Sequence, residues 1–521
     1  MIFNLILTIS FLFVIKNRYN SDQIITRIGT NCQLNQVPFP AVSICNLNMV
    51  SKRESMSSIF QILENNNVTK NQIWNFLQNL PNLKDYSESV RNVSDLTKIL
   101  SIMKKHYFTV ESLMEEVHQK CDKLLLYCEF NRKAKNCGDI FKLIKTYEGH
   151  CCAFNYAALN DDSETADLAK DDDIEYFDDP SGEDVKTNAR ILVNSESGRG
   201  SGLSVIINVE PFDYPNWSSL PYFGAKILLS DPNDYPETTV LYKFVTLGES
   251  LDIKVEPMVF LCENNIRQVS PDKRNCWFHD EVLLEYTDRY SYETCKTECK
   301  MQNFLRNCGC VPYKYPIEIS TPICEFENLE CLNNVTAYKS EEDRACDPVC
   351  YMECWDKRYS ITSDLTPLIP ELFPANVTKD HNAGDLCALQ VYFAKSSCNS
   401  YKLMLLIDFN YFIATYGEWA PKADILFDTI FCRLEFSHAE AFYRAVANGK
   451  RESLYAGGGE YTHGLLLHTN ATGMFGGRGA AVKRDPIPPG LAAEQSVPQP
   501  ARGCNARKNT LKAFKSARGS F

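Results

Sequence analysis

Residues 290–312 read YSYETCKTECKMQNFLRNCGCVP, and the spacing of their cysteines decides the fold. Cys295 and Cys299 are four residues apart, which places two side chains on one face of a helix. Residues 346–354, CDPVCYMEC, form a second row of cysteines with the same spacing. Two facing rows can be joined rung by rung into a stiff rod that does not depend on a large hydrophobic core.

Cysteine is concentrated in this part of the chain. Ten of the 22 cysteines lie in the 79 residues from Cys276 to Cys354, and the other twelve are spread over the remaining 442. Such a density is typical of disulfides formed in an oxidising compartment. The alternative is structural zinc, but only His279 lies in the block, and ten cysteines do not divide into four-ligand sites. The pattern favours disulfides.

Composition excludes several classes of protein. The 521 residues are 44% apolar and 23% charged, which is ordinary for a globular chain and excludes a collagen-like or wholly disordered one. The net charge of −12 and the pI near 5.3 argue against nucleic acid as a partner. The chain has no glycine-rich phosphate loop, His-Glu-x-x-His or Gly-x-Ser-x-Gly motif. We therefore expect neither an enzyme nor a bound metal or cofactor.

Nearly the whole net charge of the chain lies in one segment. Residues 161–184, DDSETADLAKDDDIEYFDDPSGED, hold twelve carboxylates and one lysine. Like charges at this density repel one another, so the pattern predicts a solvated loop. The alternative interpretation is a negative potential that attracts cations near a pore.

The start of the chain is apolar. Residues 1–15, MIFNLILTISFLFVI, are shorter than the span of about 20 residues that a membrane helix needs. A signal peptide would have a basic residue before the apolar run and a small-residue cleavage site after it, and neither is present. We interpret residues 1–19 as part of a transmembrane helix. Tyr19 follows it directly and is a candidate gating contact or, equally, an interfacial aromatic anchor.

Sequons support an extracellular middle of the chain. Asn-x-Ser/Thr occurs at Asn67, Asn92, Asn216, Asn334, Asn376 and Asn470.

The rest of the body predicts an α+β fold. Residues 56–148 have helical apolar spacing and suggest surface helices. Alternation or β-branched residues predict strands in several separate places. These are residues 37–48, 202–209, 223–229, two within 238–263, and 386–393. Because the strands come from distant parts of the chain, one α+β domain with helical insertions fits better than a row of small domains.

Several stretches, in order along the chain, resemble the degenerin/epithelial sodium channel family, close to its pickpocket branch. They are FPAVSICNLN at 39–48, GHCCAFN at 149–155, NCWF at 275–278, YSYETCKTEC at 290–299 and CGCVP at 308–312. The resemblance covers about residues 1–417. It implies a membrane-anchored, disulfide-rich ectodomain with a palm and β-ball sheet, a helical finger and a thumb.

The resemblance also implies domain boundaries and disulfides. The extracellular domain would span residues 20–400, with the finger at about 51–150 and the thumb at 276–355, and residues 401–417 would begin the second transmembrane helix. The implied pairs are Cys45–Cys151, Cys128–Cys137, Cys276–Cys354, Cys295–Cys350, Cys299–Cys346, Cys308–Cys331 and Cys310–Cys324. Cys387 and Cys398 are candidates for a local bond. Cys32, Cys121, Cys152 and Cys262 are left without an assigned partner.

Two family elements are missing from the sequence as written. The cytosolic segment with a His-Gly motif would precede residue 1, and a glycine-rich span with Gly-x-Ser would follow Gly417. Residues 418–521 instead hold 12 of the 24 glycines and 16 alanines in low-complexity runs, which predicts a disordered tail. We interpret this tail as a different reading frame or intron read-through, with an alternative exon as the rival explanation. No selectivity-filter residue can be named.

The function implied by the resemblance is a subunit of a sodium-permeable, amiloride-sensitive cation channel in the plasma membrane. We expect the chain as written to lack its pore and to form no conducting homomer. It would be gated by an extracellular stimulus that moves the thumb. Its partners would be sodium ions, two further subunits of the family in a trimer, and membrane lipid. The alternative is a pore-less anchored or secreted binding module that acts as a decoy or a dominant-negative subunit.

Overall fold

The computed structural model describes residues 24–405, together with residues 10 and 13. The described range has gaps at 87–89, 91, 159–190, 219, 288, 318–319, 338–345 and 370–380. The expected first membrane segment with Tyr19, the acidic segment 161–184, Asn376 and the tail 418–521 with Asn470 therefore lie outside the described residues. Residues Ile24–Leu406 form one compact unit.

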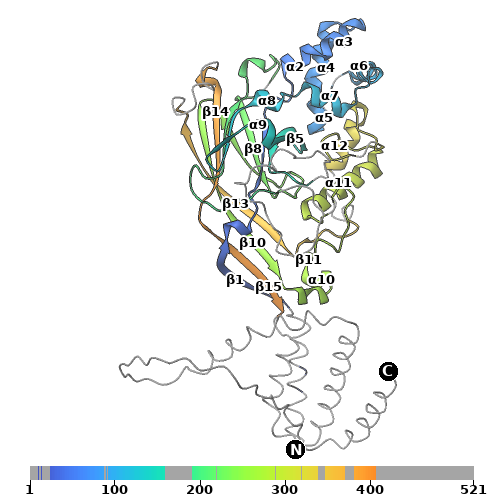
Figure 1. Cartoon of the computed structure of the whole chain (residues 1–521). Coiled ribbons are helices and arrows are strands. Elements are labelled where there is room, and N and C mark those ends of the chain that lie inside the picture. Colours follow the sequence, from blue (N-terminus) through green and yellow to red (C-terminus); the bar gives the residue numbers. More distant parts are fainter. Residues whose placement is uncertain are drawn as a thin grey trace, which may run out of the picture. The chain divides into compact units, whose positions relative to one another are not determined.

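Two β-sheets form the centre of this unit (Figure 1). The larger sheet has eight strands in the order β1-β15-β10-β14-β7-β3-β4, with β13 also paired to β10. Its strands are β1 (Ile24–Gln33), β3 (Leu125–Phe130), β4 (Lys133–Lys135), β7 (Leu203–Asn208), β10 (Glu249–Cys262), β13 (Asp356–Pro367), β14 (Leu386–Phe393) and β15 (Ser397–Leu405).

The second sheet has five strands in the order β5-β6-β2-β8-β9. They are β2 (Ala41–Asn46), β5 (Phe141–Thr146), β6 (Gly149–Phe154), β8 (Gly224–Ser230) and β9 (Leu241–Thr246). All six residues of β2 are buried, as expected for a strand in the middle of a covered sheet. A short parallel pair, β11 (Cys276–Trp277) and β12 (Met352–Glu353), lies apart from both sheets.

A cluster of aromatic rings lies in the core shared by the two sheets. Phe39 is fully buried, and its ring centroid lies 5.5 Å from that of Phe130, 6.0 Å from that of Phe154 and 5.5 Å from that of Phe393. The rings meet edge to face, an arrangement that adds about 0.5–1.5 kcal/mol per pair to the burial of their surface.

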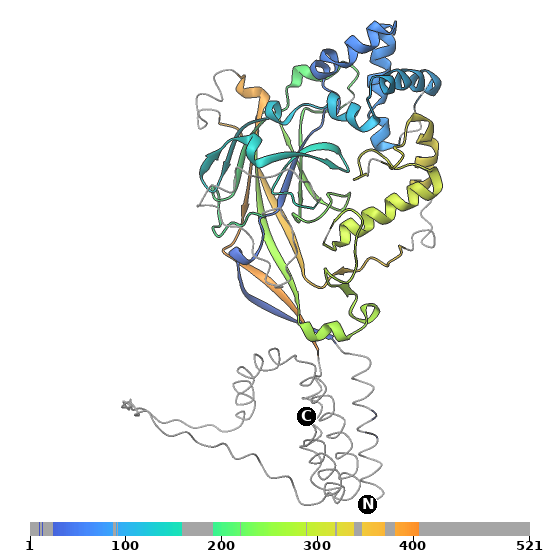
Figure 2. The same ribbon diagram turned by 45° about the vertical axis from the view of Figure 1, so that its right-hand side comes forward.

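Helices α2–α7 gather at one end of the described unit and have a hydrophobic core of their own (Figures 1 and 2). They are α2 (Lys52–Ser57), α3 (Ile59–Asn65), α4 (Lys70–Asn79), α5 (Asn82–Asp85), α6 (Val93–Lys105) and α7 (Val110–Val117). Capping boxes start two of them, with Thr69 bonded to Gln72 before α4 and Thr109 bonded to Ser112 before α7.

The α+β class and every predicted strand are confirmed, with β9 and β10 as the two strands within 238–263. The helical prediction for residues 56–148 holds as far as α8 (Cys121–Leu124) and is wrong beyond it, apart from the single turn α9 (Cys137–Ile140). There β3, β4 and β5 are strands, because pairing with β7 and β6 overrides the local preference. Residues 401–405 also belong to a strand, β15.

Within the part of the chain that is described, no helix combines the length and the apolar composition needed to cross a membrane.

Candidate functional site: the disulfide ladder and its two joints

Five disulfides join the residues between Cys276 and Cys354, and we call this group the ladder. They are Cys276–Cys354, Cys295–Cys350, Cys299–Cys346, Cys308–Cys331 and Cys310–Cys324. With Cys45–Cys151 and Cys128–Cys137, the structure contains all seven pairs that the resemblance implies.

Helix α11 (Tyr292–Cys308) carries one side of the ladder. Ser291 caps its start by accepting a hydrogen bond from the Thr294 amide, and Gly309 ends it in the left-handed conformation, with φ of 71°. The four-residue spacing of Cys295 and Cys299 aims both sulfurs at the returning chain, as expected. Helix α12 (Leu329–Ala337) is tied to the end of α11 by Cys308–Cys331.

Two further disulfides are not among the pairs that the resemblance implies. Cys121 pairs with Cys152, and Cys32 pairs with Cys398 across β1 and β15. The local bond expected between Cys387 and Cys398 is therefore wrong, and Cys387 is a buried free thiol in β14. The register that brings Cys32 opposite Cys398 follows from strand pairing across the whole chain, which local sequence spacing does not reveal.

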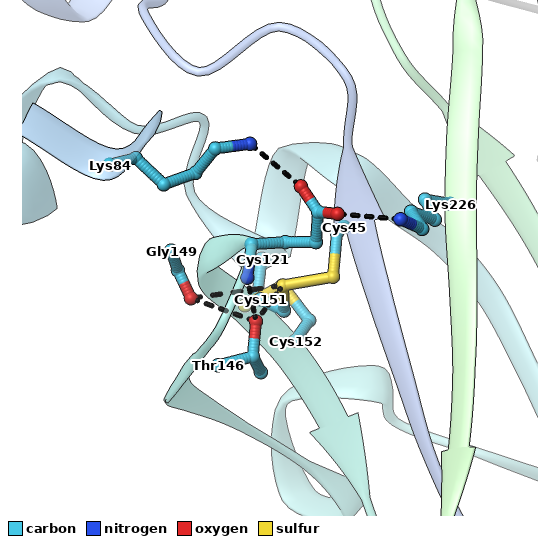
Figure 3. Close-up of a disulfide and its surroundings, with 9 residues drawn as sticks. Cys45, Lys84, Cys121, Thr146, Gly149, Cys151, Cys152 and Lys226 are labelled. Atoms are coloured by element: carbon cyan, nitrogen blue, oxygen red, sulfur yellow. Dashed lines mark hydrogen bonds and ion pairs between the residues drawn. A yellow bond between two sulfur atoms is a disulfide. The ribbon is translucent and has the colours of Figure 1, made fainter. Parts of the chain in front are cut away.

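The first joint connects the helices to the five-stranded sheet around Cys45–Cys151 (Figure 3). A cavity of about 640 Å³ lies here, lined by α4, α5, β2, β8 and the 215–220 segment, with Trp217 in its wall. Figure 3 shows Lys84 of α5 and Lys226 of β8 on opposite sides of the disulfide. The Glu148 carboxylate binds both ammonium groups, at 2.8 Å from Lys84 and 2.5 Å from Lys226.

Charge neutralisation holds this joint together. Burial by itself would raise the pKa of Glu148, but the two ammonium groups outweigh it, so that pKa lies below its ordinary value. Burial likewise opposes the charge on Lys84, but Glu148 and Asp85, which lies 3.3 Å from the ammonium group, together outweigh it, so the pKa of Lys84 is raised. Each charge is therefore retained in a partly dry site because the others are present, and the helices are linked electrostatically to the sheet.

The second joint lies where the ladder meets the sheets, and it is acidic. Asp231, Asp234, Glu353 and Asp356 line a cavity of about 280 Å³. Asp234 accepts a hydrogen bond of 2.5 Å from the Ser291 hydroxyl, at the start of α11. The Tyr292 amide donates to Glu353 at 3.1 Å, and Arg358 is paired with Asp356 at 2.6 Å. Residues of the ladder and of the sheets thus share one hydrogen-bonded acidic site.

Burial and mutual repulsion weaken the acidity of this joint. Burial, with Asp356 adding to it, raises the pKa of Glu353 to about 8. Burial, with Asp231 adding to it, raises the pKa of Asp234 well above its ordinary value. The pKa of Asp356 is also raised by burial, although Arg358 opposes the shift. The sequence does not reveal that these acidic side chains lie close together, because they come from separate elements.

The sequons in the described part are accessible. Asn67, Asn92, Asn216 and Asn334 are all exposed. Asn67 and Asn92 have positive φ values of 60° and 59°, which asparagine tolerates better than most residues. Their exposure makes each available to a modifying enzyme. Tyr19 and Asn376 have no described position.

Comparisons with known proteins identify the family. The family model described as amiloride-sensitive sodium channel matches residues 1–419. Sodium channel protein Nach of Drosophila ananassae is 26% identical over 345 residues, which are 65% of this chain and 60% of that protein. Pickpocket protein 28 of Drosophila melanogaster is 26% identical over 443 residues, 79% of this chain and 68% of its own.

A vertebrate relative matches over a shorter region. The gamma subunit of the epithelial sodium channel of Xenopus laevis is 26% identical over 183 residues, 34% of this chain and 26% of that subunit. The chain spans 60% of Nach from Drosophila ananassae and 50% of Nach from Drosophila melanogaster. The family consists of ion channels, so this chain is not an enzyme. The family match over most of its length and the order of its motifs show that the chain belongs to the amiloride-sensitive sodium channel family.

Proposed function

We propose that this chain is a subunit of a sodium-permeable, amiloride-sensitive cation channel, with residues 24–405 in its extracellular domain. The observation that carries the proposal is the set of nine disulfides within a segment that matches the family. Disulfides at this density form and persist outside the reducing cytosol. Relatives that are named as sodium channels support sodium as the permeating ion. The plasma membrane is the location that such a channel would have.

In this proposal the described elements take the family's roles. Residues 276–355 act as the thumb, helices α2–α7 as the main part of the finger, and the two sheets as palm and β-ball. Residues 1–19 and the chain after β15 would be the membrane segments, in contact with lipid. Partner subunits of the same family complete a trimer. The exposed sequons would carry glycans, and Tyr19 would meet the base of the thumb.

The mechanism we infer uses the ladder as a lever. Its disulfides keep its shape, so a force on one end moves the other end. At its base, Cys276 and Cys354 pack in a cluster that includes Ile24 of β1 and Leu405 of β15. These two strands pair along their length and lead toward the proposed membrane segments. A ligand or force that moves the ladder at either joint would reach the pore through them.

Co-expression with a pickpocket or epithelial sodium channel subunit tests the proposal. We expect a sodium current that exceeds that of the partner alone, disappears when sodium is replaced by a large organic cation, and is blocked by amiloride. Surface biotinylation measured in parallel controls for delivery. If the chain is present at the cell surface and leaves the partner's current unchanged in size, block and ion preference, the proposal is wrong.

A second candidate is the pore-less module that lowers the current of its relatives. The observation that favours it is the change in composition at residue 418, next to the end of the family match at 419. Sequencing the messenger RNA across the codons for Tyr416 to Trp419 separates the two. Transcripts that continue into a glycine-rich apolar span with Gly-x-Ser support the channel subunit, and transcripts that mostly encode the tail written here support the module.

A further inference from the structure

A third sulfur lies beside one disulfide of the ladder. Cys262, the last residue of β10, is a buried free thiol. Its sulfur and the two sulfurs of Cys276–Cys354 all lie within 4.8 Å of one another. A covalent S–S bond is about 2.05 Å long, so the exchange requires the sulfurs to approach by less than about 3 Å. The described part of the chain contains no other group of three potential ligand residues this close.

The three sulfurs lie at the base of the ladder, next to the large sheet. Cys276 and Cys354 close the base of the ladder, since they are its first and last cysteines. Cys262 lies opposite Leu403 in the parallel pairing of β10 with β15. The three sulfurs share a hydrophobic cluster with residues of β1 and β15. They therefore lie where the ladder meets β10 of the large sheet and the adjoining strands β15 and β1.

We propose that Cys262 is an internal exchange partner for the Cys276–Cys354 disulfide and can take the place of either cysteine in it. The product would tie the ladder directly to β10 of the large sheet. This inference concerns covalent chemistry within the chain and does not depend on the proposed channel function.

The exchange balances without an external oxidant or reductant. Cys262 gives its proton to a solvent base, and the resulting thiolate attacks the sulfur of Cys354 along the S–S axis. The bond between Cys262 and Cys354 forms as the bond to Cys276 breaks, and the Cys276 thiolate takes up a proton from water. Attack on Cys276 is equivalent and releases Cys354. The number of disulfides and of thiols is unchanged.

A buried arginine stands beside the reacting sulfurs. Arg274 donates a hydrogen bond of 2.9 Å from Nε to the Cys276 carbonyl oxygen and pairs with Glu281. Burial raises the pKa of the Cys262 thiol to about 12, and the Arg274 charge opposes this shift. A nearby cation favours both the attacking and the leaving thiolate. Burial makes the exchange slow in the described conformation, and any movement of the ladder base that admits water would accelerate it.

Substitution of one cysteine of the pair tests whether the third can replace it. In Cys354→Ser, we expect a Cys262–Cys276 disulfide after normal oxidative folding of the full chain, and in Cys276→Ser a Cys262–Cys354 disulfide. Acid-quenched alkylation, peptic digestion without reductant and mass spectrometry identify the pairs. Cys387→Ser is the matched control, because Cys387 is also a buried free thiol but belongs to no three-sulfur group in the described residues. It should leave the pairs unchanged. Alkylated Cys262 together with an alkylated remaining cysteine would overturn the proposal.

The unmodified chain provides a test that does not require a variant to fold. Native protein is incubated at pH 7, 8 and 9, quenched with acid, alkylated and digested as above. We expect a peptide that links Cys262 to Cys276 or Cys354, with an initial rate that rises about tenfold per pH unit because the thiolate fraction does so below the thiol pKa. The proposal is wrong if Cys262 is alkylated alone and Cys276–Cys354 is intact at every pH.

Discussion

At the scale of single residues, Glu148 is the charged group on which the first joint depends. Its carboxylate is the common partner of Lys84 and Lys226, whose side chains are only 14% and 12% exposed. When one member of a partly buried charge cluster is removed, the others keep their desolvation cost without their compensation. The sequence places Glu148 before the Gly-His-Cys-Cys motif but does not identify its partners, because they lie in a helix and a strand that are distant along the chain.

The first prediction concerns this carboxylate. Glu148→Gln should lower the free energy of unfolding by about 3 kcal/mol, since Lys226 loses its counter-charge and Lys84 keeps only that of the more exposed Asp85. Chemical denaturation followed by intrinsic fluorescence measures the change. The control is Glu196→Gln, which removes an ion pair with Arg132 whose side chains are 65% and 60% exposed and should cost less than about 0.5 kcal/mol. Equal effects of the two substitutions would contradict the electrostatic account of the joint.

At the scale of elements, the ladder is a nested series of closed loops. When Cys276–Cys354 and Cys295–Cys350 are already formed, Cys299–Cys346 closes only a small ring. This ring consists of the two short segments between it and the neighbouring disulfide. The entropy that a disulfide removes from the unfolded chain depends on the number of residues in the loop that it closes. Each disulfide shortens the loop that its neighbour would otherwise close, so one partly compensates for the loss of the other. The rungs should therefore be energetically coupled.

The second prediction measures that coupling. Replacing both cysteines of Cys295–Cys350, or both of Cys299–Cys346, by serine should cost about 2–2.5 kcal/mol in each case. Replacing all four should cost about 1 kcal/mol more than the sum, because the loop then left open is longer. Denaturant unfolding of the three variants tests this. Combining the loss of Cys295–Cys350 with that of the distant Cys128–Cys137 is the control and should be additive. Additivity in both combinations would contradict the nested arrangement.

The third prediction concerns the acidic joint. The folded pKa of Glu353, about 8, lies above its unfolded value near 4.5, so folding takes up a proton between these pH values. The stability that Glu353 contributes is fully present below about pH 4.5 and is lost as the pH rises toward 8, by at most about 1.4 kcal/mol per pH unit. The wild-type melting temperature minus that of Glu353→Gln should therefore be larger at pH 5 than at pH 8.

Using this difference cancels the titrations of groups that do not interact with Glu353. His118 and His150 have pKa values lowered by burial to about 4 and about 3, so they reduce stability in acid and act in the opposite direction. Both histidines are present in wild type and variant. A temperature difference that is constant between pH 5 and 8, or that grows with pH, would show that Glu353 keeps an ordinary pKa.

The elements also show what the sequence could and could not predict. The strands with clear alternation, such as β7 and β14, and the rows of cysteines in the ladder were predictable because their signals are local. The strands β3 and β5 follow a long helical stretch, and their pairing with β7 and β6 is non-local. The Cys32–Cys398 bond and the acidic joint could not be predicted for the same reason, since each joins residues from separate elements.

At the scale of the whole molecule, a channel ectodomain must lie outside the cell. The fourth prediction is that Asn67, Asn92, Asn216 and Asn334, which are exposed, each carry a glycan. Single Asn→Gln substitutions should each increase mobility on a denaturing gel by one glycan, and peptide N-glycosidase should abolish the differences. A chain whose mobility does not respond to the enzyme would contradict the extracellular assignment.

The central claim is that residues 24–405 form the ectodomain of a sodium channel subunit, and a chimaera tests it most directly. The segments before residue 24 and after residue 405 are replaced by the corresponding parts of pickpocket protein 28, and currents are recorded alone and with a family partner. We predict an amiloride-blocked sodium current from a chimaera that is present at the cell surface. A chimaera that reaches the surface, keeps its nine disulfides by peptide mapping and conducts no sodium current in either setting would contradict the claim.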